Sequence, residues 1–325
     1  MKKVLGILCV MAALYGCTKE KKSTDTDSSG RISISGAWAL YPMMVRWAEV
    51  YQKMHPETII DISAGGAGKG MADALCHAVD LGMISRDINK SEIEKGAWWV
   101  SVVKDAVIPT INENNPFKNE LKKRGLSQSD FSQIWLAGKI TTWNRFISDT
   151  IIRPIHVYTR CDACGAAETW AKYVGGSQED LQGVGVYGDP GLADAVRNDA
   201  LGIGYNNVNY VYDAKTKKPI PGIVPLPLDI NGNGTIDHSE NFYADRDSLI
   251  QAIADNKYPS PPARNLHLVS SGIPEKKLVL QFMLWILGEG QQFVSESGYI
   301  ALPIEQLKKH SVELQKKMNE MNDKK

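Results

Sequence analysis

An alternation of strand and helix patterns in the first third of the chain constrains the fold most. Three runs rich in branched residues, at 32–35, 58–63 and 80–85, predict strands. The stretches between them, 42–51 and 71–78, predict helices, the first from apolar residues that recur at helical spacing. A β-α-β-α-β order requires crossover connections, so it predicts a mostly parallel sheet with helices packed on it.

Glycine-bearing turns follow the first two of these strands, and Arg86 follows the third. In such sheets ligands bind beyond the carboxyl ends of the strands. The loop Gly65–Gly70 matches neither the G-x-x-x-x-G-K-[ST] nor the G-x-G-x-x-G nucleotide fingerprint. Its glycines would let the backbone come close to a ligand of another kind. The alternative is that they serve only the close packing of a strand–helix turn.

A second candidate site lies in the stretch Tyr158–Lys172. A β-type run ends near Thr159, and a helix follows with Glu168 in its first turn. Free N–H groups and a partial positive charge at a helix start favour a small anion, and Arg160 adds a forked, charged donor. Asp162 fits a ligand that donates a proton, or it orients Arg160. The alternative is a surface turn with a local Arg–Asp pair.

The N-terminus predicts export. Lys2 and Lys3 precede an apolar run of secretory length, and Leu14-Tyr15-Gly16-Cys17 resembles the lipobox of bacterial lipoproteins. We therefore expect a signal peptide at 1–16 and acylation of Cys17; the alternative is a soluble secreted protein. The charged, Ser/Thr-rich segment 17–30 predicts a flexible tether.

The composition fits two globular domains and no nucleic-acid partner. The chain has 325 residues and a formal net charge of zero. Cys161 and Cys164 have C-x-x-C spacing, which permits a redox pair, a local disulfide or two inert thiols. The six histidines are scattered and no Ser-His-Asp spacing is visible, so the sequence predicts no enzyme.

Residues 229–240 match the twelve-residue EF-hand loop position by position, with Gly234 at the sharp turn. The expected metal ligands are Asp229, Asn231, Asn233, Thr235 through its carbonyl, Asp237 and Glu240. Four prolines in 219–228 exclude an entering helix, whereas 241 onward permits an exiting one. We expect one structural Ca²⁺ with a dissociation constant of roughly 10⁻⁵ to 10⁻³ M; the alternative is a metal-free hairpin.

Three further segments complete the domain prediction. The apolar run Val102–Asn112 is suited to carry the chain between lobes, and Pro259–Pro262 reads as a stiff crossing segment. Residues 306–325 form a charged C-terminal tail, with a loose helix expected from Ser311.

In this order, several motifs resemble the phosphate-binding proteins of bacterial ABC-type uptake systems, which are lipoproteins in one form. These motifs are Ile34-Ser35-Gly36 through Pro42, Gly65–Gly70, Ser85-Arg86-Asp87, Gly138–Trp143, Arg160-x-Asp162-x-Cys164-Gly165, Gly202–Tyr205 and Glu296–Tyr299. The resemblance implies a type II periplasmic-binding-protein fold, α/β, with two lobes of mainly parallel sheet and the ligand in the cleft. It divides the body into lobe 1 (31–110 and 263–305) and lobe 2 (111–262) with the calcium loop inserted.

The resemblance also implies the ligand and the partners. The phosphate contacts would be Ala39, Leu40, Tyr41, Ala67, Gly68, Arg86, Arg160, Asp162, Cys164, Gly165 and Ala166. A membrane permease is the implied partner of a monomer that is lipid-anchored at the periplasm or cell surface. The family commonly places hydroxyls on the anion, and this chain lacks them at the matching positions. Another tetrahedral oxyanion (sulfate, molybdate or tungstate) therefore stays as an alternative ligand. A calcium-dependent surface module, which would use the EF-hand loop, stays as an alternative of a different class.

Overall fold

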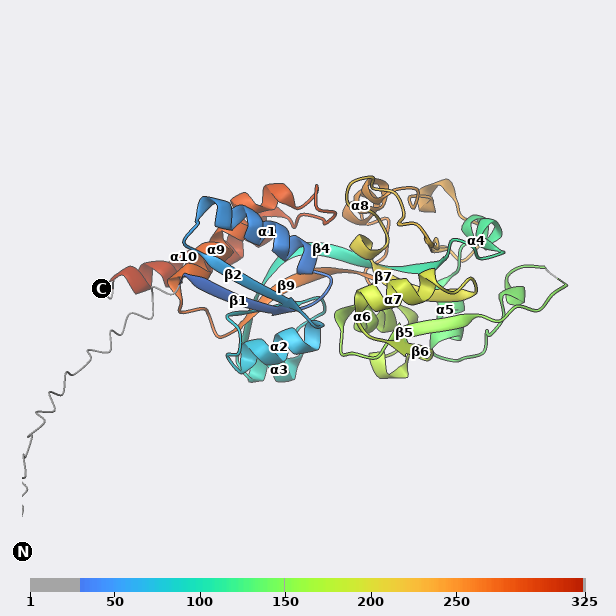
Figure 1. Cartoon of the computed structure of the whole chain (residues 1–325), viewed down its shortest axis with the longest axis horizontal. Coiled ribbons are helices and arrows are strands. Elements are labelled where there is room, and N and C mark those ends of the chain that lie inside the picture. Colours follow the sequence, from blue (N-terminus) through green and yellow to red (C-terminus); the bar gives the residue numbers. More distant parts are fainter. Residues whose placement is uncertain (1–29, 149, 324–325) are drawn as a thin grey trace, which may run out of the picture.

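The computed structural model of the chain describes residues 30–148 and 150–323, which form two α/β lobes side by side (Figure 1). A single path of paired strands runs through both, in the order β2-β1-β3-β9-β4-β7-β5-β6, with β8 paired to β4. The predicted signal peptide 1–16, the lipidation site Cys17 and the tether up to residue 29 lie outside the described residues.

Lobe 1 is built on the predicted β-α-β-α-β unit, and its strands β1, β2 and β3 are parallel. Its elements are β1 (Arg31–Gly36), α1 (Tyr41–Met54), β2 (Ile59–Ala64), α2 (Ala67–Leu75), β3 (Leu81–Ile84), α3 (Lys90–Glu94), α9 (Lys277–Leu287) and α10 (Ile304–Asp323). The second helix begins four residues before the predicted 71–78, because the glycine loop itself starts the helix.

Lobe 2 repeats the layered arrangement, with β5 parallel to both β6 and β7. Its elements are α4 (Lys118–Arg124), α5 (Gln128–Trp135), β5 (His156–Arg160), α6 (Gly165–Val174), β6 (Val184–Val186), α7 (Gly188–Arg197), β7 (Gly202–Asn207), β8 (Ile223–Pro225) and α8 (Arg246–Ala254). The aromatic rings of α5 and α6 pack on β7: Trp170 stacks on Tyr205 with ring centroids 5.6 Å apart.

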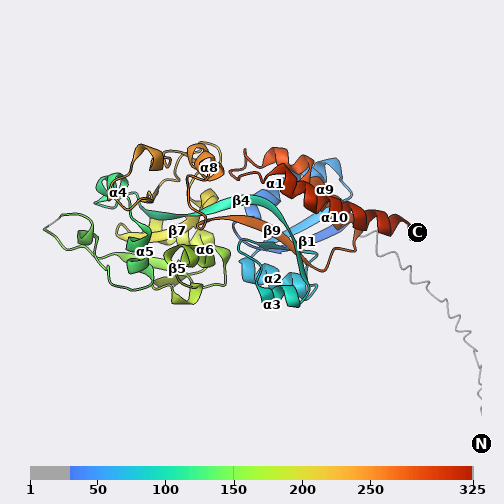
Figure 2. The ribbon, with the colours of Figure 1, turned by 180° about the vertical axis from the view of Figure 1, so that it is seen from behind.

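Two long antiparallel strands join the lobes (Figure 2). They are β4 (Ala97–Asn112) and β9 (Ala263–Ser271), paired from Ala97 opposite Ser271 to Ala106 opposite Ala263. The prediction that Pro259–Pro262 is itself a crossing segment is wrong. Those residues form a turn in which the Ala263 N–H donates to the Pro259 carbonyl, since prolines lack the N–H that a ladder requires. The crossing is made by β9, which follows.

Each lobe has its own hydrophobic core. One cluster of buried residues comes from β1–β3, α1, α2, α9 and α10, and the other from α5–α8, β5 and β7. The helix predicted from Ser311 is present, but it begins at Ile304 and is not loose. Helix α10 packs along α9 and buries Leu307, Leu314 and Met318 in the core of lobe 1. Within the described ranges, no helix combines the length and apolar character that a membrane crossing requires.

Candidate anion-binding site

Strand β5 delivers Arg160 to the boundary between the lobes. Pairing with β7 holds the start of the strand and pairing with β6 holds its end, and the hydroxyl of Tyr205 lies 2.8 Å from Thr159 Oγ1. The same hydroxyl accepts a hydrogen bond from the Arg160 N–H at 3.2 Å. The Arg160 side chain is 0% exposed, so its guanidinium is held inside the protein.

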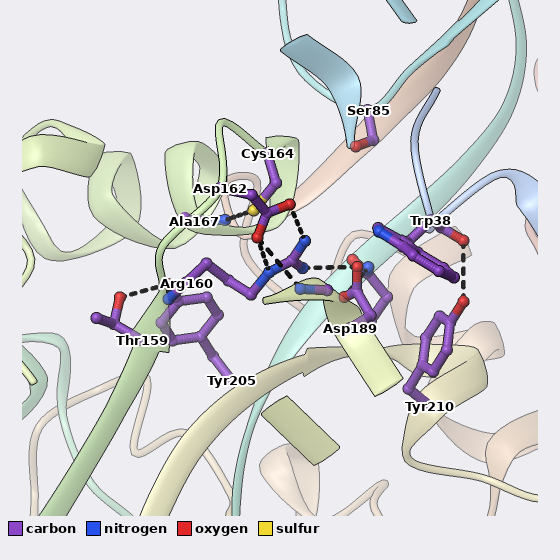
Figure 3. A network of polar contacts seen from close by, with 12 residues as sticks. Trp38, Ser85, Thr159, Arg160, Asp162, Cys164, Ala167, Asp189, Tyr205 and Tyr210 are labelled. Atoms are coloured by element: carbon purple, nitrogen blue, oxygen red, sulfur yellow. Dashed lines mark hydrogen bonds and ion pairs between the residues drawn. The ribbon is translucent and has the colours of Figure 1, made fainter. Parts of the chain in front are cut away.

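Two carboxylates orient the Arg160 guanidinium (Figure 3). Its Nε and Nη2 donate to the two oxygens of Asp162 at 2.7 and 2.6 Å, and Nη1 donates to Asp189 Oδ2 at 2.7 Å. A guanidinium has five N–H donors. These contacts use three of them, so two N–H groups are left for a ligand.

Arg160 stays charged in this environment. Burial alone would lower the pKa of Arg160, but attraction to Asp189 and Asp162 raises it above its ordinary value. Burial raises the pKa of Asp189, and Arg160 opposes that shift. The three side chains therefore act as one ion cluster, with a cation between two anions.

A chain of buried polar groups continues from Asp189 to the crossing strands. Asn207 Nδ2 donates to Asp189 Oδ1 at 2.5 Å, and Arg264 of β9 donates from Nη2 to Asn207 Oδ1 and from Nε to the Ser85 carbonyl at 2.7 Å. Sequence reasoning missed Asp189, Asn207 and Arg264. No signal in the sequence singled out Arg264, because strand β9 reads Ala-Arg-Asn-Leu-His-Leu-Val-Ser-Ser and is more than half polar.

Asp105 of β4 lies near this chain and is 1% exposed. Burial raises the pKa of Asp105 to about 7, against the opposing charge of Arg264. Burial likewise lowers the pKa of Arg264. Both crossing strands thus carry one ionisable side chain into the space beneath the site.

The start of α1 also reaches the site. Leu40 is its N-cap and Tyr41 its first residue, and the Ala39 carbonyl accepts a hydrogen bond from Tyr299 at 2.6 Å. The ring of Trp38 lies against Gly188, at the start of α7. Its buried Nε1 has no hydrogen-bond partner among residues 30–148 and 150–323, which makes it a further donor that the sequence did not reveal.

The start of α2 touches the other lobe directly. The Gly68 N–H donates to the Ala163 carbonyl at 3.1 Å, and Ala67 is buried beside it. A Cβ at Gly165 would lie 2.2 Å from the Ser85 carbonyl oxygen. Glycine is therefore required where the lobes meet, and the structure is a closed form.

Cys164 is the N-cap of α6, which begins with Gly165 and Ala166. Its Sγ accepts a hydrogen bond from the Ala167 N–H at 3.4 Å, and burial raises the pKa of the thiol to about 12. Cys161 is exposed, and both cysteines are free thiols. The buried thiol is therefore protonated and holds the helix start in the place of a hydroxyl.

Arg86 lies at the end of β3, where the sequence puts it, but its guanidinium is engaged by carboxylates. It binds Glu92 through Nη1 and Nη2 at 2.9 and 2.6 Å, and Nε lies 3.2 Å from Glu168 of α6. Lys172 of α6 also pairs with Asp87 at 3.0 Å. Arg86 thus joins the two lobes in this closed form.

The structure brings the other predicted contacts together from both lobes: the α1 and α2 starts from lobe 1, and Arg160, Asp162 and the α6 start from lobe 2. The predicted calcium loop 229–240 lies elsewhere in lobe 2, against the connection between α4 and α5.

Curated relatives of the chain are phosphate-binding proteins by name. "Phosphate-binding protein PstS 3" of Mycobacterium leprae is 23% identical over 352 residues, covering 92% of this chain and 94% of that protein. "Phosphate-binding protein PstS" of Methanocaldococcus jannaschii is 24% identical and covers 93% of each. "Phosphate-binding protein PstS 2" of Streptococcus pneumoniae is 27% identical over 128 residues, and that match spans only 41% of its length.

Solved structures show the same fold. A putative phosphate ABC transporter substrate-binding protein with bound phosphate from Clostridium perfringens has a TM-score of 0.69 at 23% identity, covering 84% of this chain and all of that one. An ABC-type phosphate transport receptor from Vibrio cholerae has a TM-score of 0.59 at 18% identity, with coverage of 84% and 100%. The model of the PBP superfamily domain matches residues 21–289. The predicted type II periplasmic-binding-protein fold is confirmed, and the chain belongs to the PBP superfamily.

Proposed function

We propose that this chain is an exported solute-binding protein that captures inorganic phosphate between its lobes for an ABC transporter. One observation carries the proposal: a fully buried arginine, Arg160, has two free N–H donors at the point where the lobes meet. The names of the relatives and of the similar structures support the choice of phosphate.

Recognition would combine charge with directional hydrogen bonds. The two remaining N–H groups of Arg160 suit two oxygens of a tetrahedral anion. The N–H groups that open α6, at Gly165 and Ala166, add donors and the positive end of a helix. Asp162 lies beside them and accepts a hydrogen bond, so it favours an anion that still carries a proton.

The fold accounts for capture and release. Arg86 and Glu168 pair across the lobes, as do Asp87 and Lys172, and the continuous strands β4 and β9 connect them. Binding would draw the lobes together, and opening would break these pairs. The proposed protein is a monomer, anchored through Cys17 to a bacterial membrane at its periplasmic or outer surface. It delivers phosphate to a permease and catalyses no reaction.

Isothermal titration of residues 18–325 with phosphate tests the proposal. We expect one site per chain, and sulfate should bind far more weakly. Absence of heat at millimolar phosphate, with calcium present, would exclude the proposed function.

A second candidate ligand is a different tetrahedral oxyanion. Hydroxyl side chains are missing at Ala39, Ala67, Cys164 and Ala166, and each lost hydroxyl–anion bond is worth about 1.5–3 kcal/mol if it is not replaced. Competition titrations with sulfate, molybdate and tungstate separate the candidates. Displacement of phosphate by one of them at lower concentration would identify that anion as the ligand.

A further inference from the structure

Buried carboxylates reveal a second charged centre, remote in sequence from the anion site. In the described part of the chain four carboxylates are buried: Asp105, Asp189, Asp229 and Glu240. Asp189 is paired with Arg160, and Asp105 forms no ion pair with a described residue but is attracted by the charge of Arg264. Asp229 and Glu240, each 3% exposed, belong to one loop and form no ion pair with any described Lys, Arg or His. Two buried carboxylates of one loop that lack a cationic partner would be stabilised by a bound cation.

Backbone N–H groups fix both carboxylates within the loop. Asp229 accepts from Gly232 and Asn233 with Oδ1 at 2.8 and 3.1 Å, and from Gly234 with Oδ2 at 2.8 Å. Glu240 accepts two N–H groups with Oε1 and one with Oε2. An oxygen that accepts a single N–H keeps a lone pair, so Asp229 Oδ2 and Glu240 Oε2 can still bind a metal ion.

The side chains of Asn231, Asn233 and Asp237 also lie together within the loop. The Oδ1 atoms of Asn231 and Asn233 each accept a hydrogen bond from the backbone N–H two residues later in the chain. Their Nδ2 groups both donate to Asp237 Oδ2, at 2.7 and 3.0 Å. No cluster of three or more His, Cys, Asp or Glu side chains within the described ranges is arranged to bind a metal without other ligands. The asparagine oxygens and a backbone carbonyl would therefore have to complete the coordination here.

We propose that loop 229–240 binds one calcium ion. All the donors are hard oxygens, with no thiol or imidazole among them, which matches Ca²⁺ rather than Zn²⁺ or Cu²⁺. The oxygen side chains occupy loop positions 1, 3, 5, 9 and 12 of the twelve-residue pattern, and Gly234 supplies the turn at position 6 with φ +78°. Six oxygens from one loop suit calcium better than the smaller Mg²⁺, which keeps several waters.

The loop attaches to the body of lobe 2 at both ends. The Asp229 N–H donates to the Leu126 carbonyl, and the Ile236 N–H donates to the Lys123 carbonyl at 2.8 Å. The exiting helix that the sequence predicts from Asn241 is absent: a 3-10 turn ends at Glu240, and α8 begins only at Arg246. With no helix pair to open, the ion would stabilise lobe 2 and leave lobe closure unchanged.

Thermal unfolding of residues 18–325 with calcium, with magnesium and with a chelator is the first test. Calcium at about 100 times its dissociation constant should raise the melting temperature by about 5 °C relative to chelator. Titration calorimetry should give one site in the range of roughly 10⁻⁵ to 10⁻³ M, with weaker binding of magnesium. Equal melting temperatures and no calorimetric heat at 10 mM calcium would overturn the proposal.

Two variants locate the site. Glu240→Gln should abolish the calcium-dependent shift, whereas Glu120→Gln, which removes an exposed carboxylate of lobe 2 outside the loop, should keep it. If Glu240→Gln does not fold, the half-buried Asp237→Ala is expected to weaken calcium binding at least tenfold. A calcium response that survives in these loop variants would place the ion elsewhere and refute the assignment. Phosphate binding by the same proteins is measured in separate titrations. A failure of the calcium proposal can therefore be distinguished from a failure of the phosphate proposal.

Discussion

The Arg160 guanidinium donates to Asp189 Oδ2 at 2.7 Å, and this contact joins the end of β5 to the first turn of α7. Asp162 holds the other edge of the same guanidinium. A cation fixed on two sides cannot turn to follow a ligand, so the ligand must fit the two N–H directions that are left. The site is therefore preorganised by contacts within lobe 2 alone.

Arg160→Lys should weaken phosphate binding about 100-fold, because an ammonium cannot replace a fork of directional donors whose bonds are worth about 1.5–3 kcal/mol each. Titration calorimetry measures the change. The exposed Arg145→Lys is the control and should bind like the parent protein. Similar affinity in both variants would remove Arg160 from the site.

Asp162→Asn should reduce the factor by which phosphate binds more tightly than sulfate. A carboxylate accepts a hydrogen bond from the O–H group of hydrogen phosphate and repels the unprotonated sulfate, whereas an amide can donate to either anion. Competition titration at pH 7 gives the ratio of the two dissociation constants, and we expect it to fall about tenfold or more. A constant ratio would mean that Asp162 only orients Arg160.

Glu168→Gln should speed the release of phosphate. The carboxylate contacts Arg86 Nε at 3.2 Å and Lys172 Nζ at 3.1 Å, so its loss removes an ion pair that exists only when the lobes are closed. Partly exposed pairs of this kind are worth about 0.5–1 kcal/mol, which corresponds to a two- to fivefold faster dissociation. Stopped-flow tryptophan fluorescence is the measurement, with Glu305→Gln on α10 as control. A change confined to the association rate would argue against this role.

His267 should make the fold sensitive to acid. Burial lowers the pKa of His267 from 6.5 to about 4; Asp87 opposes this shift, whereas His310 and Arg86 add to it. The unfolded chain therefore binds the proton more readily below pH 6.5, and stability falls as the pH drops from 6.5 to 4, by about 3 kcal/mol.

Denaturant unfolding of the parent protein and His267→Gln at pH 7, 5.5 and 4.5 isolates this effect. The two proteins must be compared at each pH because Asp105 also titrates in this range. Its pKa is raised to about 7, so its contribution to the free energy of unfolding decreases as the pH rises, opposite to that of His267. The difference between the two proteins should shift in favour of the variant on acidification. A difference that does not depend on pH would show that the imidazole titrates normally.

Leu314→Ala should destabilise the protein by about 2–5 kcal/mol, because this side chain of α10 is fully buried against lobe 1. Val312 on the same helix is 70% exposed, so Val312→Ala should change the unfolding free energy by less than about 0.5 kcal/mol. Chemical denaturation of both variants tests the packing. Equal unfolding free energies for the two variants would mean that α10 does not pack on lobe 1.

Local patterns predicted most of the fold. The strands of lobe 1 and helix α1 follow from branched runs and helical spacing, which are properties of adjacent residues. The C-terminal helix was misjudged because its many charges conceal three apolar positions, Leu307, Leu314 and Met318, that fall on one face. Composition describes the whole segment, whereas packing depends on a single face.

The candidate site was predictable only in part. Arg160 and Asp162 lie two residues apart, so their pairing could be expected from the sequence. Asp189 and Arg264 reach the same place from a helix and a crossing strand, and without a three-dimensional arrangement nothing in the sequence joins them. For the same reason the contact of Arg86 with the opposite lobe was missed, since Glu168 belongs to that lobe.

The ion cluster around Arg160 has a consequence for the range of salinity in which the protein can work. One guanidinium faces two carboxylates, Asp162 and Asp189, so the cluster carries no excess positive charge that could attract an anion over long distances. Dissolved salt screens long-range attraction beyond about 8–10 Å, but it barely affects short hydrogen bonds in a closed cleft. Added salt would therefore not slow the capture of phosphate, because there is no long-range attraction for it to screen.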